Sequence, residues 1–129
     1  MAIHHLQLWV PDLTRADVSW GWLLDQVGFT LSRRWESGRV WRMEGTGLVL
    51  EQSPDMVPGM LYSRFRPGLN HIAFTMDDAD ALARLVDAAP DHGWTQVGAT
   101  DRHPLPQGTT VAYIEDADGF EVELVVPGP

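Results

Sequence analysis

One strand-like segment occurs twice in this chain, and each copy carries a histidine in the same place. The copies cover residues 3–10 and 69–76, and in both of them apolar residues alternate with other residues at period two. Side chains alternate between the two faces of a strand, so His5 and His71 both point away from the apolar stripe. Two imidazoles repeated on the less apolar face predict two half-sites that face one another across a pseudo-twofold axis.

The duplication extends beyond these strands. Each copy is followed by a helix-like stretch, at about residues 13–27 and 78–89. Gly28 and Gly93 then stand where the end of a helix favours glycine in the left-handed conformation. The helix residues expected to face inward are Val18, Trp22, Val27, Leu82, Leu85 and Val86.

Three strand-like runs follow each helix. They cover residues 30–35, 39–43 and 48–52 in the first half and 95–99, 109–114 and 120–126 in the second. Each half therefore reads βαβββ, which predicts an α+β fold. We expect a single domain of 1–129, with module one at 1–52, a linker rich in Pro and Gly at 53–68 and module two at 69–129.

The last strand of each half places a carboxylate on the histidine face. Gly47 precedes Glu51 by four residues, and Gly119 precedes Glu123 by the same number, so the sequence aligns the two glutamates. Two imidazoles and two carboxylates suit a divalent first-row ion such as Zn²⁺, Ni²⁺, Fe²⁺, Mn²⁺ or Co²⁺. The predicted metal ligands are His5, Glu51, His71 and Glu123. A slip of one residue in register would put Gln52 in place of Glu51, and this alternative stays open.

Such a site can act as a Lewis acid and can orient a substrate. Either carboxylate, Glu51 or Glu123, could leave the ion and act as a catalytic base. The side chains expected to contact the substrate are Gln7, Trp9, Trp41, Thr75, His103 and Tyr113. Of these, His103 lies in a Pro-rich loop and could reach the rim of a pocket as an acid or base. The remaining tryptophans considered, Trp20, Trp22 and Trp94, are expected to pack in the interior.

The composition excludes several classes of partner. Nine basic against eighteen acidic residues give a net charge of −9, which repels nucleic-acid phosphates. The chain has no cysteine, and no apolar run approaches the roughly 20 residues of a membrane span. We expect a cytoplasmic protein. The linker carries Met56, Met60, Leu61, Tyr62 and Phe65, some of which should be buried, either over the site or in a homodimer contact.

The whole pattern resembles the vicinal oxygen chelate superfamily, which includes glyoxalase I, methylmalonyl-CoA epimerase, extradiol dioxygenases, and bleomycin- and fosfomycin-resistance proteins. The motifs that carry the resemblance are IHHLQLWVPDL, VGF, LVLEQSP, LNHIAFTMDD, HGW and DADGFEVELVVP. The resemblance implies that the two modules pair edge to edge, within one chain or by swapping between two chains. Their eight strands would then form a cup with the helices outside and the metal within, and His5, Glu51, His71 and Glu123 would take the metal-ligand positions.

This fold hosts several activities. The predicted ligand set favours a metal-dependent lyase or isomerase of glyoxalase type that acts on a small oxygen-bearing substrate through an enediolate-like intermediate. The alternative is a small-molecule-binding or antibiotic-resistance protein that sequesters an aromatic ligand against Trp9, Trp41 and Tyr113. A third possibility is an extradiol ring-cleaving dioxygenase. That enzyme needs two histidines and one glutamate, and the additional carboxylate at Glu51 argues against it.

Overall fold

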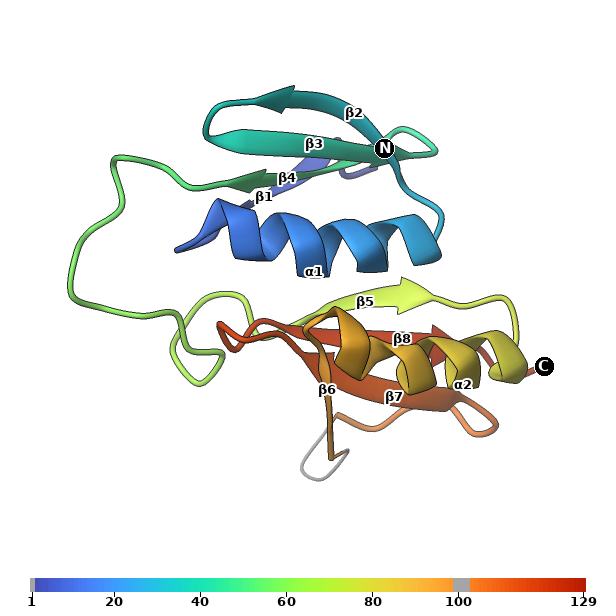
Figure 1. The fold of residues 1–129 in the computed structure, drawn as a ribbon. Helices are drawn as coiled ribbons and strands as arrows, with labels where there is room; N and C mark the ends of the chain where they lie inside the picture. The colour runs from blue at the N-terminus through green and yellow to red at the C-terminus, as the bar shows by residue number, and fades with distance from the viewer. Residues whose placement is uncertain (1, 99–102) are drawn as a thin grey trace. The chain divides into compact units, whose positions relative to one another are not determined.

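The computed structural model describes residues 2–98 and 103–129 of the chain. It contains two compact units, Met1–Leu61 (unit 1) and Tyr62–Pro129 (unit 2), and the boundary between them lies within the predicted linker (Figure 1). In the described residues, each unit holds one α-helix and one four-stranded sheet. This order of elements confirms the predicted α+β fold with two βαβββ modules. The pairing of the modules into a cup stays a prediction.

Unit 1 folds in the order expected from its sequence. Its elements are β1 (His5–Trp9), α1 (Leu13–Gln26), β2 (Thr30–Trp35), β3 (Gly38–Met43) and β4 (Thr46–Glu51). The sheet has the strand order β1-β4-β3-β2, with β1 parallel to β4 and the other neighbours antiparallel. The first and last strands of the module therefore lie side by side, which brings the predicted histidine and carboxylate strands together.

Unit 2 repeats this arrangement. Its elements are β5 (Ile72–Thr75), α2 (Ala79–Ala88), a short 3₁₀ helix η1 (Ala89–His92), β6 (Thr95–Val97), β7 (Thr110–Glu115) and β8 (Glu121–Val126). The strand order is β5-β8-β7-β6, and β5 is parallel to β8. The run predicted at 95–99 ends at Val97, and its last residue lies outside the described residues.

Equivalent residues begin and end the two helical segments. Asp12 and Asp78 each accept a hydrogen bond through Oδ1 from the backbone amide three residues on, at 3.0 and 2.7 Å. These side chains satisfy amides that have no partner within the helix. Gly28 and Gly93 have φ angles of 102° and 88°, which confirms the predicted left-handed glycines.

The buried face of α1 differs from the predicted one. Val18 is 63% exposed, and Trp22 and Val27 are half-buried. The residues of α1 that are buried are Leu13, Ala16, Ser19, Trp20, Gly21, Leu23 and Leu24. Both sets have helical spacing, so periodicity alone allowed either face. The observed face buries more apolar side-chain area, because it contains a tryptophan and three leucines.

The other predicted core positions are largely correct. Leu82 and Leu85 of α2 are buried, while Val86 is half-buried. Trp20 and Trp94 are fully buried, as expected for packing residues. The apolar stripes of β4 and β8 are also buried, and these residues are Leu48, Leu50, Val122 and Leu124.

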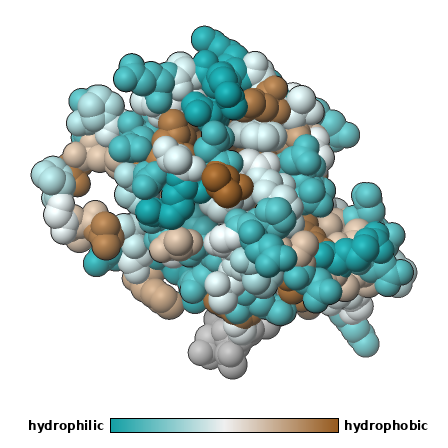
Figure 2. Space-filling model, viewed as in Figure 1, coloured by the Kyte–Doolittle hydropathy of each residue, from teal (hydrophilic) through white to brown (hydrophobic). Residues whose placement is uncertain are grey.

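The predicted linker is mostly exposed. Its most exposed apolar side chains are Val57, Met60, Leu61 and Phe65. Met56 and Tyr62 are half-buried, and the Tyr62 ring stacks on Phe120 with centroids 4.1 Å apart. On the face shown in Figure 2, apolar residues are scattered among hydrophilic ones. The homodimer contact stays a prediction. No helix in the described part of the chain is long and apolar enough to cross a membrane.

Candidate metal centre

A tight turn between β7 and β8 sets the position of Glu123. Asp116 accepts hydrogen bonds through Oδ1 from two backbone amides of this turn, each at 2.9 Å. Gly119 takes a φ of 87°, which residues with a side chain rarely adopt. The resulting register pairs Tyr113 with Glu123, on the face opposite the buried leucine and valine of β8. Glu123 is nevertheless only 2% exposed.

Two histidine side chains reach this carboxylate. His71 Nε2 lies 3.4 Å from Glu123 Oε1, and His103 Nε2 lies 3.3 Å from the same oxygen. The two imidazole rings are parallel to within 1°, with centroids 5.9 Å apart. One ligand atom of each of the three residues lies within 4.8 Å of the other two. His71 immediately precedes β5, whereas His103 comes from the segment that leads to β7.

Neighbouring carbonyl groups determine which ring nitrogen carries the proton when these imidazoles are neutral. Asn70 donates through Nδ2 to the backbone oxygen of Arg64 at 3.0 Å, so its Oδ1 faces Nδ1 of His71 at 2.7 Å. A carbonyl oxygen only accepts, and His71 must therefore donate through Nδ1. The backbone oxygen of Pro104, 3.3 Å from Nδ1 of His103, imposes the same tautomer there. Both Nε2 atoms then present lone pairs to Glu123.

This convergence of electron pairs is unfavourable while both imidazoles are neutral, and a cation would relieve it. An unprotonated Nε2 and a carboxylate oxygen both only accept hydrogen bonds, so they cannot bond to each other. A proton on an imidazole would satisfy one pair, as a charge-assisted hydrogen bond. Ligand atoms about 2.1 Å from one metal ion lie about 3.0 to 3.4 Å apart at octahedral to tetrahedral angles. The observed separations of 3.3 and 3.4 Å fit that geometry, so His71, His103 and Glu123 suit a divalent first-row ion.

The sequence missed His103 as a third partner of Glu123. It was expected only as an acid or base at the rim of a pocket. The repeat could not identify it as a ligand, because His103 lies in a loop and not in a strand that both halves share. Its Pro-rich setting was the only available signal.

Two further residues complete this face of the second sheet. The Tyr113 ring meets the His71 ring edge-on, with centroids 6.1 Å apart and planes at 86°. Glu121, whose side chain is fully buried, accepts from Nε of Arg64 at 2.8 Å. The carboxylate of Glu121 is therefore neutralised by an arginine, whereas that of Glu123 faces the two histidines.

In unit 1, Glu51 is in contact with Gln7 and not with His5. Gln7 donates from Nε2 to Oε1 of Glu51 at 3.0 Å. Nδ1 of His5 lies 2.8 Å from Nδ1 of His4. In the strand ladder, His5 stands opposite Gly47, so Glu51 lies four residues, or about 13 Å, further along the strand. The four predicted metal ligands comprise two residues of each unit, and their joint binding of one ion stays a prediction.

The strand ladders make Val49, and not Glu51, the counterpart of Glu123. When His5 is placed on His71, β1 and β5 coincide, and the β4 residue that matches Glu123 is Val49. The first sheet therefore has an apolar side chain where the second sheet has the carboxylate that the histidines approach.

The alignment by glycine was wrong because the two glycines have different roles. Gly119 forms a turn in the left-handed conformation, whereas Gly47 lies within β4. The glycine with the corresponding role is Gly45, with a φ of 82° in the turn before β4. Six residues separate Gly45 from Glu51, but only four separate Gly119 from Glu123.

The predicted role of Trp41 as a pocket wall is wrong. Trp41 pairs with Leu48 in the ladder of β3 and β4, which places both on the buried face of the sheet. A Cβ atom added to Gly21 of α1 would lie 3.4 Å from the Trp41 ring. Its buried Nε1 has no hydrogen-bond partner among the described residues. Trp9, in contrast, is 45% exposed on the same face of β1 as Gln7.

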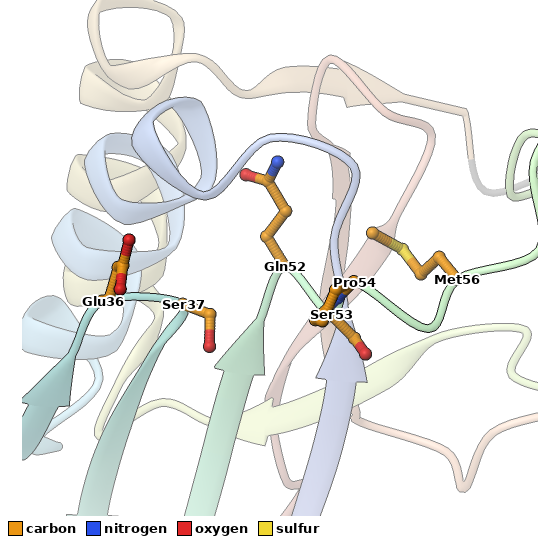
Figure 3. Close-up of a pocket in the computed structure, with 6 residues that line it drawn as sticks. All are labelled: Glu36, Ser37, Gln52, Ser53, Pro54 and Met56. Atoms are coloured by element: carbon orange, nitrogen blue, oxygen red, sulfur yellow. The ribbon is translucent and has the colours of Figure 1, made fainter.

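Gln52 has a structural partner and is a weak alternative to Glu51. Its Oε1 accepts from the backbone amide of Leu13, at the start of α1, at 2.8 Å. It also lines an open pocket of about 540 Å³ in unit 1, shown in Figure 3. The residues around this pocket are Glu36, Ser37, Gln52, Ser53, Pro54 and Met56. None of the predicted substrate-contacting residues lines it, and the contacts predicted for Gln7, Trp9, Thr75 and Tyr113 stay predictions.

Comparisons with known proteins agree with this architecture. The family model of the glyoxalase/bleomycin resistance protein/dioxygenase superfamily matches residues 4–113. YqjT, an uncharacterized protein of Bacillus subtilis (strain 168), is 33% identical over 127 residues, which cover 97% of this chain and 98% of YqjT. A solved structure from Bacillus halodurans is 28% identical with a TM-score of 0.85, covering 97% of this chain and 95% of that one. A glyoxalase/bleomycin resistance protein from Albidiferax ferrireducens T118 has the same fold, with a TM-score of 0.73, 16% identity, and coverage of 96% and 97%. The chain therefore belongs to the glyoxalase/bleomycin resistance protein/dioxygenase superfamily.

Proposed function

We propose that this protein is a divalent-metal-dependent lyase or isomerase of glyoxalase type that acts on a small oxygen-bearing substrate. The observation that supports this proposal is the convergence of Nε2 of His71 and Nε2 of His103 on one oxygen of Glu123, at 3.4 and 3.3 Å. These three residues would hold the ion. The sequence also predicts His5 and Glu51 as ligands, and that part of the prediction is tested separately below.

The exposure of the three residues suggests a division of roles. When bound, a divalent ion supplies Lewis acidity to neighbouring substrate oxygens and orients them. The side chain of Glu123 is 3% exposed and one of its oxygens contacts both imidazoles, so it is suited to stay in place as a ligand. The side chain of His103 is 51% exposed, so it can leave the ion, turn toward a substrate and take up a proton on the freed Nε2. We therefore assign the proton transfer to His103, where the sequence predicted Glu51 or Glu123 as the base.

Metal analysis of the purified chain tests this proposal. The protein is stripped with a chelator, dialysed against Zn²⁺, Ni²⁺, Co²⁺, Mn²⁺ or Fe²⁺, and analysed for bound metal. We expect one ion per chain, and little or none after His71→Ala or Glu123→Gln, because each change removes one ligand. His92→Ala, in η1, serves as a control that also removes one imidazole. A folded wild-type protein that retains no metal from any of the five solutions would contradict the proposal.

A second candidate is a ring-cleaving dioxygenase, and one observation favours it. Two histidines and one carboxylate, with further coordination positions open, are the ligand type used by non-haem Fe²⁺ oxygenases. The additional carboxylate that argued against this activity, Glu51, is hydrogen-bonded to Gln7. Fe²⁺-dependent oxygen consumption with a catechol would favour the dioxygenase. Turnover of a 2-oxoaldehyde adduct with Ni²⁺ or Zn²⁺, without oxygen consumption, would favour the lyase or isomerase.

A further inference from the structure

We infer that Asn70 is a positioning residue that holds His71 in the tautomer with its proton on Nδ1. This keeps the lone pair of Nε2 directed at Glu123. The inference rests on the proposed function only where it concerns metal affinity. The tautomer itself follows from hydrogen bonds of the side chain of Asn70, and it can be measured without metal.

Asn70 has a fixed orientation because its two amide atoms have different partners. Nδ2 donates to the backbone oxygen of Arg64 at 3.0 Å, which leaves Oδ1 to face Nδ1 of His71 at 2.7 Å. Rotating the amide by 180° would place Oδ1 against the Arg64 carbonyl and Nδ2 against His71. Two acceptors would then oppose each other, so this orientation is disfavoured.

The carbonyl that orients Asn70 lies in an anchored segment. The Arg64 side chain is held by the buried carboxylate of Glu121 at 2.8 Å. Tyr62 donates from its hydroxyl to the backbone oxygen of Leu69 at 2.6 Å and stacks on Phe120. Of the two anchoring residues, Glu121 is the first residue of β8, the strand that also carries Glu123, and Phe120 immediately precedes it. The segment 62–70 thus links the orientation of the His71 ring to the strand that supplies the carboxylate.

Unit 1 lacks this device at the equivalent place. His4 precedes His5 as Asn70 precedes His71, and the contact there joins Nδ1 of His4 to Nδ1 of His5 at 2.8 Å. Either of two imidazoles can be the donor in such a contact, so no tautomer is imposed on His5. His4 therefore provides a matched control position for Asn70.

Removing the Asn70 side chain should change the state of His71. Without Oδ1, Glu123 Oε1 remains as an acceptor for the ring, 3.4 Å from Nε2. The proton of the neutral ring is then better placed on Nε2, where it can be donated to the carboxylate. That proton occupies the electron pair a metal ion would need. Removing a partner that orients a metal-binding histidine typically lowers metal affinity 10- to 100-fold.

The test is ¹⁵N NMR of the histidine rings in the metal-free full chain, at alkaline pH where imidazoles are neutral. We expect His71 of the wild type and of His4→Ala to carry its proton on Nδ1. In Asn70→Ala we expect it on Nε2, or in exchange between both nitrogens. Asn70→Asp keeps an acceptor oxygen and should retain the Nδ1 proton. A wild-type His71 protonated on Nε2, or an Asn70→Ala variant that keeps the proton on Nδ1, would overturn the inference.

Co²⁺ titration followed by visible absorption provides the second readout. We expect Asn70→Ala to bind Co²⁺ about 10- to 100-fold more weakly than the wild type. Asn70→Asp and His4→Ala should stay close to the wild type, which would separate the missing acceptor from a general loss of structure. Equal Co²⁺ affinity of Asn70→Ala and the wild type would count against the positioning role. A wild type that binds none of Zn²⁺, Ni²⁺, Co²⁺, Mn²⁺ and Fe²⁺ would contradict the proposed function, while the NMR result would still decide the tautomer.

Discussion

Gln7 donates a hydrogen bond to Glu51 across the parallel strands β1 and β4, with 3.0 Å between Nε2 and Oε1. The corresponding strands of unit 2 bring His71 to within 3.4 Å of Glu123 instead. An amide satisfies a carboxylate oxygen without any cation, whereas an imidazole lone pair does not. The two sheets of this duplicated fold therefore use their carboxylates differently, and among the described residues only the second shows a cluster of three potential metal ligands.

The first prediction compares the two glutamates. Glu51→Gln should leave metal stoichiometry and affinity unchanged, because the glutamine at this position can still bond to Gln7. Glu123→Gln should lower metal affinity by about a hundredfold or more, since it removes a direct ligand and not merely a supporting group. Calorimetric titration with Zn²⁺ measures both. A large loss of affinity in Glu51→Gln would instead support the four-ligand set with His5.

The second prediction concerns His103. His103→Ala should weaken metal binding by at least about tenfold and reduce turnover, because it removes both an electron pair and the exposed proton acceptor. The thermal midpoint should change little, since the side chain is half exposed and contributes little to the core. His92→Ala is the matched control. Unchanged metal affinity together with lost activity would make His103 a base alone and not a ligand.

The third prediction concerns alkaline pH. Burial raises the pKa of the Tyr62 hydroxyl above its ordinary value of 10.0, with Glu121 and Asp116 adding to the rise and Arg64 opposing it. The folded state thus favours the protonated phenol. Its contribution to stability is fully present below the pKa of the unfolded chain and is lost as pH rises through the higher folded pKa.

Urea unfolding at a series of pH values around 10 measures this effect. The chain contains no lysine and no cysteine, so its two tyrosines are the side chains with an ordinary pKa in this range. Tyr62→Phe should lower the free energy of unfolding by about 1 kcal/mol at neutral pH, because the hydrogen bond to Leu69 is lost. It should also flatten the pH dependence around 10. An unchanged slope in Tyr62→Phe would refute this assignment.

The fourth prediction separates the two tryptophans that the sequence treated alike. Trp41→Ala should destabilise the fold by about 3 to 5 kcal/mol, because the ring is buried against α1. Trp9→Ala should leave the free energy of unfolding nearly unchanged. If the histidine face binds a flat substrate, the loss of Trp9 should weaken that binding by about 1 to 3 kcal/mol. Chemical denaturation and ligand titration of both variants provide the measurements.

Much of this protein could be predicted from local sequence patterns. Alternation at period two placed Leu48, Leu124 and their neighbours on the buried face, and the same alternation put His71 and Glu123 together on the opposite face. The repeat identified two βαβββ modules, because each module repeats its caps and turn residues in the same order. These features depend on residues close in sequence, and short-range backbone and solvent preferences determine them.

The tertiary structure decided the features that depend on register and on loop paths. Alternation determines which face of the sheet a residue occupies. Sliding one strand by two residues along its neighbour leaves every side chain on the same face. The sequence therefore could not distinguish Val49 from Glu51 as the counterpart of Glu123. His103 reaches Glu123 from a loop twenty residues away, and the carbonyl of Arg64 orients the side chain of Asn70. Neither contact leaves a periodic signal, because each depends on the path that a loop takes in the folded chain.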